Sequence, residues 1–277
     1  MNINGCELCP RKCGANRKLA DGYCGAGQKI RVAKAYLHMW EEPCISGKNG
    51  SGTIFFSGCT LKCCFCQNYK ISSQNFGDEI TIDRLSEIML ELQNQNAHNI
   101  NLVNPTHYVI QIIKALENIK GKLKIPVVYN SSGYERVDTL KKLDGYIGIY
   151  MPDFKYADDE IARKYSCVSD YFDVCKSAIK EMYRQVGEMR FNENGILQKG
   201  LIVRHLTLPS HRHDSIKVLD TLHDILEKNQ FILSLMSQYT PFYKAYEHKE
   251  ISRRISTYEY NFVAEYAYKL GFNGYMQ

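Results

Sequence analysis

The sequence lacks any long apolar segment. No uncharged apolar run among its 277 residues approaches the roughly 20 residues of a membrane-spanning helix, and the opening MNINGCELCP has no apolar stretch after a basic start. It also lacks a long run of Lys or Arg, because the net charge of +5 is spread along the chain. We therefore expect no membrane segment, no secretion signal and no basic arm for nucleic acid, and we expect a cytoplasmic protein.

Cysteine, by contrast, is concentrated in one region. Nine of the 11 cysteines lie within the first 66 residues, and the total is odd. A disulfide framework would pair its cysteines through a small secreted domain, so this distribution argues against one. Clustered thiols in a reducing compartment indicate metal binding.

Two regions of different character follow one another. Residues 1–50 show no sustained period of two or 3.6 residues, and we interpret them as a cysteine-rich metal-binding module. Residues 51–277 form a second domain, in which short apolar runs alternate with longer amphipathic ones. Strands are predicted at 53–58, 99–104, 124–130, 145–151, 200–206 and 231–237. Helices are predicted at 81–95, 108–120, 135–143, 158–166, 170–187 and 214–228, with a closing helix at 249–270.

This alternation predicts an α/β fold with parallel strands, because each return to the same edge of the sheet needs a crossover helix. Six strand/helix repeats are too few for a closed eight-fold barrel, so we expect an incomplete barrel or an open sheet. In either case the site should lie at the carboxyl ends of the strands. The closing helix is expected to pack through one side, made of Ile251, Ile255, Tyr258, Phe262 and Tyr266.

The segment GCTLKCCFCQN (58–68) directly follows the first strand of the repeating region. Its Cys59, Cys63 and Cys66 have the spacing C-x3-C-x2-C. Four thiolates usually hold a four-iron cluster, so three leave one iron open to another ligand. The alternative is a zinc knuckle that recruits a fourth ligand. Cys64 is the spare thiol, expected to be a small buried hydrophobe.

This motif, with Phe65 before its last cysteine, resembles the signature of the radical S-adenosylmethionine superfamily. Further segments resemble the branch of pyruvate formate-lyase activating enzyme homologues, namely EEPCISG (41–47), NLVNPTHYV (101–109), VVYNSSGYE (127–135), YMPDFKYAD (150–158), GLIVRHLTLP (200–209) and LMSQYTP (235–241). The resemblance implies a partial (β/α)6 barrel. It also implies a catalytic [4Fe-4S] cluster on Cys59, Cys63 and Cys66 that binds S-adenosylmethionine and cleaves it to a 5′-deoxyadenosyl radical.

Cofactor-binding roles follow from the resemblance for eight residues: Phe65, Asn104, Thr106, Asn130, Ser132, Asp153, Lys155 and Arg204. In the superfamily the second strand ends in a Gly-Gly-Glu-Pro-like segment, whereas this chain has Asn-Pro-Thr-His at 104–107. The carboxylate is missing there, so the contact to the amino group of S-adenosylmethionine is expected from main chain or from Thr106.

Each of these assignments has a plainer alternative. Asp153 and Lys155 could form a surface ion pair of little consequence, and Arg204 could be a solvated charge at a strand end. His107 and His205 are weaker pocket candidates at predicted strand ends. Three tyrosines at comparable points, Tyr150, Tyr156 and Tyr239, could line a pocket or relay an electron, but packing is the default.

The N-terminal thiols have the spacing C-x2-C-x3-C-x10-C, from Cys6, Cys9, Cys13 and Cys24. Four thiolates between Gly and Pro turns can hold zinc or a second [4Fe-4S] cluster, and the spacing does not choose between them. The Cys-x2-Cys-Pro-x2-Cys opening resembles ferredoxin-type ligation. Cys44 could replace one ligand, although a structural role is the simpler interpretation.

Three functions remain open from the sequence. The leading hypothesis is a radical enzyme that takes hydrogen from a protein or peptide, as the activating enzymes do, with a flavodoxin- or ferredoxin-type reductant. The second is radical modification of a small molecule or peptide side chain, assisted by the N-terminal metal. The third is a zinc-knot protein that binds nucleic acid through four basic residues, Arg11, Lys12, Arg17 and Lys18.

Overall fold

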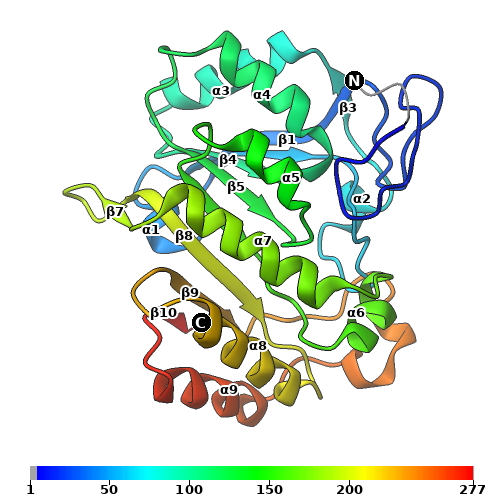
Figure 1. Cartoon of the computed structure of the whole chain (residues 1–277), viewed down its shortest axis with the longest axis vertical. Helices are drawn as coiled ribbons and strands as arrows, with labels where there is room; N and C mark the ends of the chain where they lie inside the picture. The colour runs from blue at the N-terminus through cyan, green and yellow to red at the C-terminus, as the bar shows by residue number, and fades with distance from the viewer. Residues whose placement is uncertain (1–4, 277) are drawn as a thin grey trace.

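The computed structural model describes residues 5–276, and a ten-stranded mixed sheet runs through this part of the chain (Figure 1). The strand order is β10-β9-β8-β6-β5-β4-β2-β1-β3, with β7 paired to β8. The strands are β1 Ile30–His38, β2 Ser51–Phe56, β3 Asp78–Ile80, β4 Ile100–Val103, β5 Val127–Ser131, β6 Ile149–Pro152, β7 Arg190–Phe191, β8 Leu197–Leu206, β9 Ile232–Met236 and β10 Gly274–Met276. All neighbouring pairs from β2 to β10 along this order are parallel.

Helices connect the parallel strands and cover one face of the sheet (Figure 1). The α-helices are α1 Pro43–Ser46, α2 Tyr69–Ser72, α3 Ile82–Asn94, α4 Val109–Asn118, α5 Val137–Leu140, α6 Asp159–Ser166, α7 Tyr171–Val186, α8 Arg212–Ile225 and α9 Thr257–Lys269. Short 3-10 turns are η1 Thr106–Tyr108, η2 Lys141–Leu143, η3 Ala245–Glu247 and η4 Lys249–Ile251. No helix within residues 5–276 is long and apolar enough to cross a membrane.

The six predicted strands correspond to β2, β4, β5, β6, β8 and β9, and the parallel pairing between them is confirmed. The six crossover helices are also confirmed to within a few residues. In α3 the residues buried against the sheet include Leu85, Ile88, Met89 and Leu92. This is the 3.6-residue period that the sequence shows.

The predicted boundary at residue 50 does not coincide with the start of the sheet. Strand β1 pairs antiparallel with β2, from Val32 opposite Phe56 to His38 opposite Ser51. The sequence pattern conceals this strand because only Ile30 and Val32 are fully buried, and the following residues alternate poorly. The described cysteine-rich segment outside the sheet therefore comprises residues 5–29, and its independence as a domain stays a prediction.

The closing helix is shorter than predicted, and its contact face is only partly the predicted one. It begins at Thr257 because the Ser256 hydroxyl caps the backbone N–H of Glu259, while the Glu259 side chain accepts from the N–H of Ser256. The predicted contact face is confirmed in part: Ile251 is buried, and Phe262 and Tyr266 pack against the core. Tyr258 is 66% exposed, and Val263, Ala264 and Ala267 are the buried residues of the helix that the prediction left out.

Candidate functional site

We call the face of the sheet that packs against α1 the inner face. Its side chains change from apolar to polar along the strands. Side chains two residues apart share a face, so Val128 and Asn130 both lie on the inner face of β5. Near the amino ends this face is apolar and packs against Ile45 of α1, through residues that include Val128, Ile149, Ile202 and Ile232. Two residues further along three of these strands the corresponding positions are polar, namely Asn130, Arg204 and Ser234. On β6 the position is still the apolar Met151, and the polar residue Asp153 comes two residues later. The carboxyl ends of the strands therefore enclose a buried polar layer.

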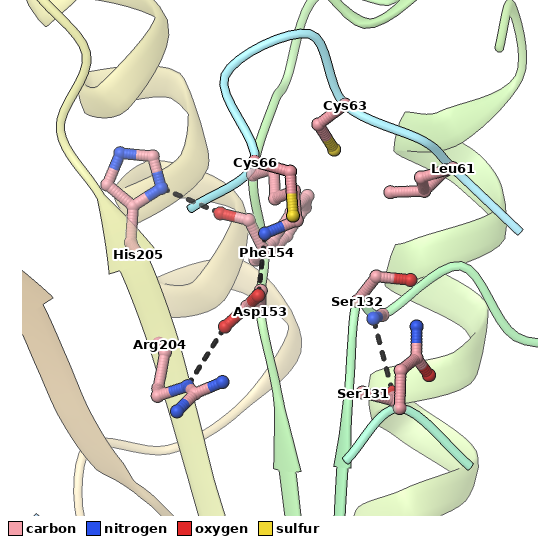
Figure 2. Close-up of polar contacts among 12 residues, drawn as sticks. Leu61, Cys63, Cys66, Ser131, Ser132, Asp153, Phe154, Arg204 and His205 are labelled. Carbon is pink, nitrogen blue, oxygen red and sulfur yellow. Dashed lines mark hydrogen bonds and ion pairs between the residues drawn. The ribbon is translucent and has the colours of Figure 1, made fainter. Parts of the chain in front are cut away.

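A chain of ion pairs crosses this layer. Lys155 Nζ donates to Asp153 Oδ2 at 2.6 Å, and Arg204 Nε donates to Asp153 Oδ1 at 2.9 Å. Arg204 also donates to Asn130 Oδ1 at 2.6 Å and lies 3.3 Å from Glu41 Oε2. Figure 2 shows Arg204 on β8 reaching across to Asp153. The plainer interpretations of these residues were wrong, because the three charged side chains are only 16–17% exposed.

Mutual pairing keeps these groups ionised. Burial opposes the charge of Asp153, but Arg204 and Lys155 outweigh it and hold the pKa of the carboxyl below its usual value. Burial likewise opposes the ammonium of Lys155, and Asp153 reverses the effect, so the pKa of Lys155 is raised. Glu41 is more weakly supported: burial raises its pKa to about 6 despite Arg204. The layer thus holds a fixed cation near the strand ends.

The cysteine loop lies over this layer, and each of its three motif sulfurs accepts a hydrogen bond. Cys59 accepts from the Leu61 N–H at 3.4 Å. The hydroxyl of Ser166, at the end of α6, donates to Cys63 Sγ at 2.9 Å, and that of Ser72 in α2 donates to Cys66 Sγ at 3.2 Å. In Figure 2 the sulfurs of Cys63 and Cys66 point toward the strand ends that carry Asp153 and Ser132. Thiols and buried cation therefore face the same space.

A buried carboxyl that the sequence reasoning missed, that of Glu135, follows the third predicted strand and contacts Thr106 at the end of the second. Thr106 Oγ1 lies 2.5 Å from Glu135 Oε1 and 2.7 Å from Asn104 Oδ1, and Tyr129 donates to Glu135 at 3.1 Å. Burial raises the pKa of Glu135 to about 7. Asn104 in turn approaches Cys59 Sγ at 3.7 Å. The carboxylate absent from the 104–107 segment is thus supplied from the loop after β5.

Glu41 was missed in the same way. Glu41 lies in the segment EEPCISG and Glu135 in VVYNSSGYE, both of which belong to the family resemblance. The sequence of these segments does not show toward which face of the sheet each carboxyl points. Arg204 identifies Glu41 as an inner-face residue, and Thr106 does the same for Glu135.

The remaining candidates divide between site and core. The hydroxyl of Ser132 is buried at the strand ends and has no hydrogen-bond partner within the described chain. Tyr156 lies behind the loop, with its hydroxyl 2.8 Å from Ser166 Oγ. Phe65 packs edge-on against Tyr239, which supports the loop from the core. Tyr150 is also a core residue, bonded to Gln185.

The two histidines do not behave as pocket groups. His205 faces away from Arg204, and its ring nitrogens bond to the Phe154 carbonyl at 2.7 Å and to Ser215 at 2.8 Å. His107 is fully buried and bonds to the Ser57 carbonyl. Burial lowers the pKa of each to about 4, so both are neutral structural residues. The prediction for His205 was wrong because adjacent residues of a strand point to opposite faces.

The N-terminal cysteines lie at the same edge of the sheet. The backbone of Cys59 donates to the carbonyl of Cys24 at 3.0 Å, and Gly58 has no room for a Cβ, which would lie 2.3 Å from that carbonyl. Cys44 lies elsewhere, buried with Ile45 at the amino ends of the strands, so its possible role as a substitute ligand was wrong. Within residues 5–276 no three His, Cys, Asp or Glu side chains converge on a point suited to a single metal ion.

The basic residues proposed for nucleic acid are occupied in part. Arg11 donates to the backbone carbonyls of Thr60, Ser166 and Cys167. Arg17 donates to the His107 carbonyl and approaches Cys24 Sγ at 3.7 Å. Arg11 thus ties the N-terminal segment to the cysteine loop, and Arg17 ties it to η1. Neither guanidinium group is free to form a row of phosphate-binding cations.

The donor set fits a four-iron cluster with a zwitterionic ligand. Three thiols on one loop, each with a hydrogen bond, leave one iron open, and hydrogen bonds to sulfur are a means of tuning such clusters. Beside them stand a buried ammonium and the unpartnered hydroxyl of Ser132. An α/β sheet with this arrangement at its strand ends defines an iron–sulfur enzyme of the partial-barrel class.

Comparison with known proteins is consistent with this class. The sequence pattern of the Radical SAM superfamily matches residues 53–189. The chain is 32% identical over 267 residues to an uncharacterized protein of Methanocaldococcus jannaschii, covering 93% of this chain and 72% of that protein. This protein belongs to the radical S-adenosylmethionine superfamily.

Two solved structures show the same fold. Methylornithine synthase (PylB) superposes with a TM-score of 0.54 at 17% identity, over 78% of this chain and 61% of that one. SuiB of Streptococcus suis, bound to its precursor peptide SuiA, gives a TM-score of 0.51 at 16% identity, over 76% of this chain and 43% of that one. The chain spans less than half the length of the SuiB chain that it matches. The predicted partial barrel is thereby confirmed.

Proposed function

We propose that this protein cleaves S-adenosylmethionine reductively and takes a hydrogen atom from a protein or peptide, in the manner of glycyl-radical activating enzymes. The observation that carries the proposal is the loop of three hydrogen-bonded thiols held over the buried Lys155–Asp153–Arg204 chain. When bound, a [4Fe-4S] cluster on Cys59, Cys63 and Cys66 supplies the electron that breaks the sulfonium bond and yields the 5′-deoxyadenosyl radical.

Lys155 binds the carboxylate of S-adenosylmethionine in this proposal. One of its three ammonium donors is directed to Asp153, which leaves others for a ligand. Arg204 holds Asp153 from the opposite side, so the position of Lys155 is fixed before the ligand arrives. Because the Lys155–Asp153–Arg204 ion pairs are largely shielded from solvent, water competes little with a carboxylate for the ammonium of Lys155.

Polar groups on the neighbouring strand ends complete the cofactor site. Asn104 lies between Thr106 and Cys59 Sγ, next to the cysteine loop, and Glu135 orients Thr106. A carboxyl with a pKa of about 7 is partly ionised and partly neutral at neutral pH, so it can accept a hydrogen bond from a hydroxyl or donate one to it. We assign Asn104 and Thr106 to the amino group of S-adenosylmethionine, and the hydroxyl of Ser132 to another polar group of the same ligand.

A peptide substrate is supported by the open sheet. In the described chain the strand order ends at β10 on one edge and β3 on the other, and does not close on itself. An extended segment of another chain can therefore approach the strand ends from the side. SuiB, which shares the fold, is bound to its precursor peptide.

The test compares two adjacent cysteines. Anaerobic protein reconstituted with iron and sulfide is incubated with S-adenosylmethionine and dithionite, and 5′-deoxyadenosine is measured. We expect Cys63→Ala to abolish the product, because its sulfur is a cluster ligand. Cys64→Ala is the matched control and should keep it, since the Cys64 backbone, not its sulfur, bonds to Tyr165 and Lys244. Retained cleavage in Cys63→Ala would refute the assignment of the loop.

The substrate class has its own test. Pyruvate formate-lyase is mixed with the reconstituted protein, S-adenosylmethionine and reductant, and its electron paramagnetic resonance spectrum is recorded. A glycyl-radical doublet supports the activating-enzyme proposal. Cleavage of S-adenosylmethionine without that doublet would exclude pyruvate formate-lyase as the substrate. It would favour modification of another peptide or of a small molecule.

A further inference from the structure

A cavity lies outside the cofactor site, between the N-terminal segment and the helices that follow β4 and β5. Its volume is about 630 Å³, which is within the range of small-molecule sites. One wall comes from the N-terminal segment, and the other from the start of α4 and from α5 with η2. In Figure 1 the N-terminal loops, drawn in dark blue, lie beside α5. Segments far apart in the sequence thus build one enclosed space.

Consecutive residues divide this cavity from the cofactor site. Glu135 contacts Thr106 in the cofactor site, whereas the next residue, Arg136, lines the cavity. Thr106 is followed by His107, whose carbonyl accepts from Arg17 of the cavity lining. The cavity is therefore a site of its own, with lining residues that the cofactor site does not use.

The lining of the cavity carries an excess of positive charge. Its two acidic side chains, Glu7 and Asp138, both pair with Arg136, at 3.0 Å and 3.1 Å. Three further cationic side chains line the cavity, namely Arg17, Lys18 and Lys142. No carboxylate within residues 5–276 forms an ion pair with any of these three. The lining is thus suited to an anionic ligand.

A buried amide supplies a second, independent feature. Gln111 is 5% exposed, and its Nε2 donates to the Gln28 carbonyl at 3.3 Å. This bond fixes the orientation of the amide, so Oε1 is the atom that remains for a ligand, and it is buried with no partner in the described chain. Buried polar atoms are rarely left unpaired, so Gln111 needs a donor from the molecule that fills the cavity.

Arg17 adds a matching donor. Two of its guanidinium nitrogens are bonded to the His107 carbonyl and to Cys24 Sγ. The third, Nε, is buried and has no partner within residues 5–276. The cavity therefore offers one fixed donor, one fixed acceptor and the mobile ammonium groups of Lys18 and Lys142.

We propose that this cavity binds a small molecule that presents an anionic oxygen group next to an O–H or N–H donor. The anionic group pairs with Lys18 and Lys142 and accepts from Arg17 Nε, while the adjacent donor bonds to Gln111 Oε1. A hydrogen phosphate group has both features, as does a carboxylate beside an amide nitrogen. The proposal goes beyond the radical chemistry and does not depend on it.

The two features together select more sharply than charge alone. Exposed lysines attract any anion, and salt screens that attraction. A buried acceptor such as Gln111 Oε1, by contrast, disfavours an anion that brings only lone pairs, because two acceptors would then face each other. Hydrogen phosphate and sulfate make this difference measurable. Both are tetrahedral oxyanions, but only phosphate keeps an O–H at neutral pH.

The experiment is calorimetric titration of inorganic phosphate, and separately of sulfate, into anaerobically reconstituted protein at constant ionic strength. S-adenosylmethionine is present in excess, so that Lys155 is not available to either ion. We expect the unaltered protein to bind phosphate at least fivefold more tightly than sulfate. Binding of neither ion, or equal binding of both as an adventitious ion only, would overturn the proposal.

Two variants assign the binding to the cavity. Lys142→Met removes an exposed cation and should weaken the binding of phosphate and of sulfate at least threefold. The matched control is Lys141→Met, on the same turn but outside the lining, which should bind both ions as the unaltered protein does. Gln111→Leu keeps the approximate size of the side chain and should lower the affinity for phosphate to that for sulfate.

An unchanged affinity for phosphate in Lys142→Met would place the ion elsewhere and overturn the proposal, whether or not Lys155 holds S-adenosylmethionine. A preference for phosphate that persists in Gln111→Leu would equally overturn it. Should Gln111→Leu not fold, the phosphate–sulfate comparison in the unaltered protein and the exposed Lys142→Met variant still decide. The proposed function is tested separately, by 5′-deoxyadenosine formation.

Discussion

Lys155 carries the buried ammonium on which cofactor binding depends in our proposal, so its removal is the sharpest test of the site. We consider Lys155→Met, which keeps most of the apolar length of the side chain but removes the charge. The lysine and its partner Asp153 are each 17% exposed, and their N–O distance is 2.6 Å. Asp153 keeps its second bond, to Arg204, in the variant.

Two energies follow from this geometry. Loss of the bond to Asp153 leaves one carboxylate oxygen without its donor, so the free energy of unfolding should fall by about 1–3 kcal/mol. Loss of a charge-assisted bond to the carboxylate of S-adenosylmethionine should cost about 1.5–3 kcal/mol of binding, a roughly 10- to 150-fold rise in Kd. The fold should survive, because the destabilisation is smaller than the stability of a typical domain.

The assay is anaerobic calorimetric titration of S-adenosylmethionine into reconstituted protein, with iron content and thermal unfolding measured on the same samples. Lys176→Met is the matched control. Lys176 makes an ion pair of 2.7 Å with Asp173 on the outer surface of α7, where such pairs contribute about 0–1 kcal/mol. We expect the control to bind S-adenosylmethionine with the affinity of the unaltered protein.

One result would refute the reasoning. If Lys155→Met keeps its iron and binds S-adenosylmethionine within twofold of the unaltered protein, then the buried ammonium is not a ligand for the carboxylate. A drop in stability without a change in Kd would then assign the Lys155–Asp153–Arg204 chain to structure alone.

Two further predictions concern the groups around the loop. Ser166→Ala removes the hydroxyl donor to Cys63 Sγ and should make the reduction potential of the catalytic cluster more negative in a redox titration, whereas the exposed Ser177→Ala should not. Because burial raises the pKa of Glu135 to about 7, its neutral form is favoured in the folded state and the free energy of unfolding should fall as pH rises from about 5 to 7. Glu135→Gln should flatten that fall by about 3 kcal/mol in denaturant titrations, and an unchanged pH profile would contradict the assignment.

The sequence alone was sufficient for features that depend on near neighbours. The alternation of short apolar and long amphipathic runs fixed the parallel strands and their crossover helices, because strand and helix periods are properties of a few consecutive residues. The spacing of Cys59, Cys63 and Cys66 after the first of these strands was enough to place three thiols on one loop at the carboxyl edge. The family follows from the same residues, and the comparisons agree.

Some local patterns misled because they do not show which face is used. Tyr258 has the helical spacing of Phe262 and Tyr266, which pack against the core, yet it is exposed, and Ala264 and Ala267 are buried. His205 lies near the end of a strand, as a pocket residue would, yet its ring points to the face covered by helices, where it forms a hydrogen bond with Ser215 of α8. In each case a neighbouring element decided the orientation.

Only the tertiary structure decided which distant groups meet. Glu41 and Arg204 are 163 residues apart in sequence and share an ion pair because β8 and the segment after β1 converge inside the sheet. Glu135 reaches Thr106 across adjacent strands, and Cys24 meets Cys59 through a backbone bond. Local spacing determines which residues share an edge or a loop. The order of strands in the sheet determines the partners of a buried charge, and so whether a carboxyl, an ammonium or a thiol can take part in the chemistry.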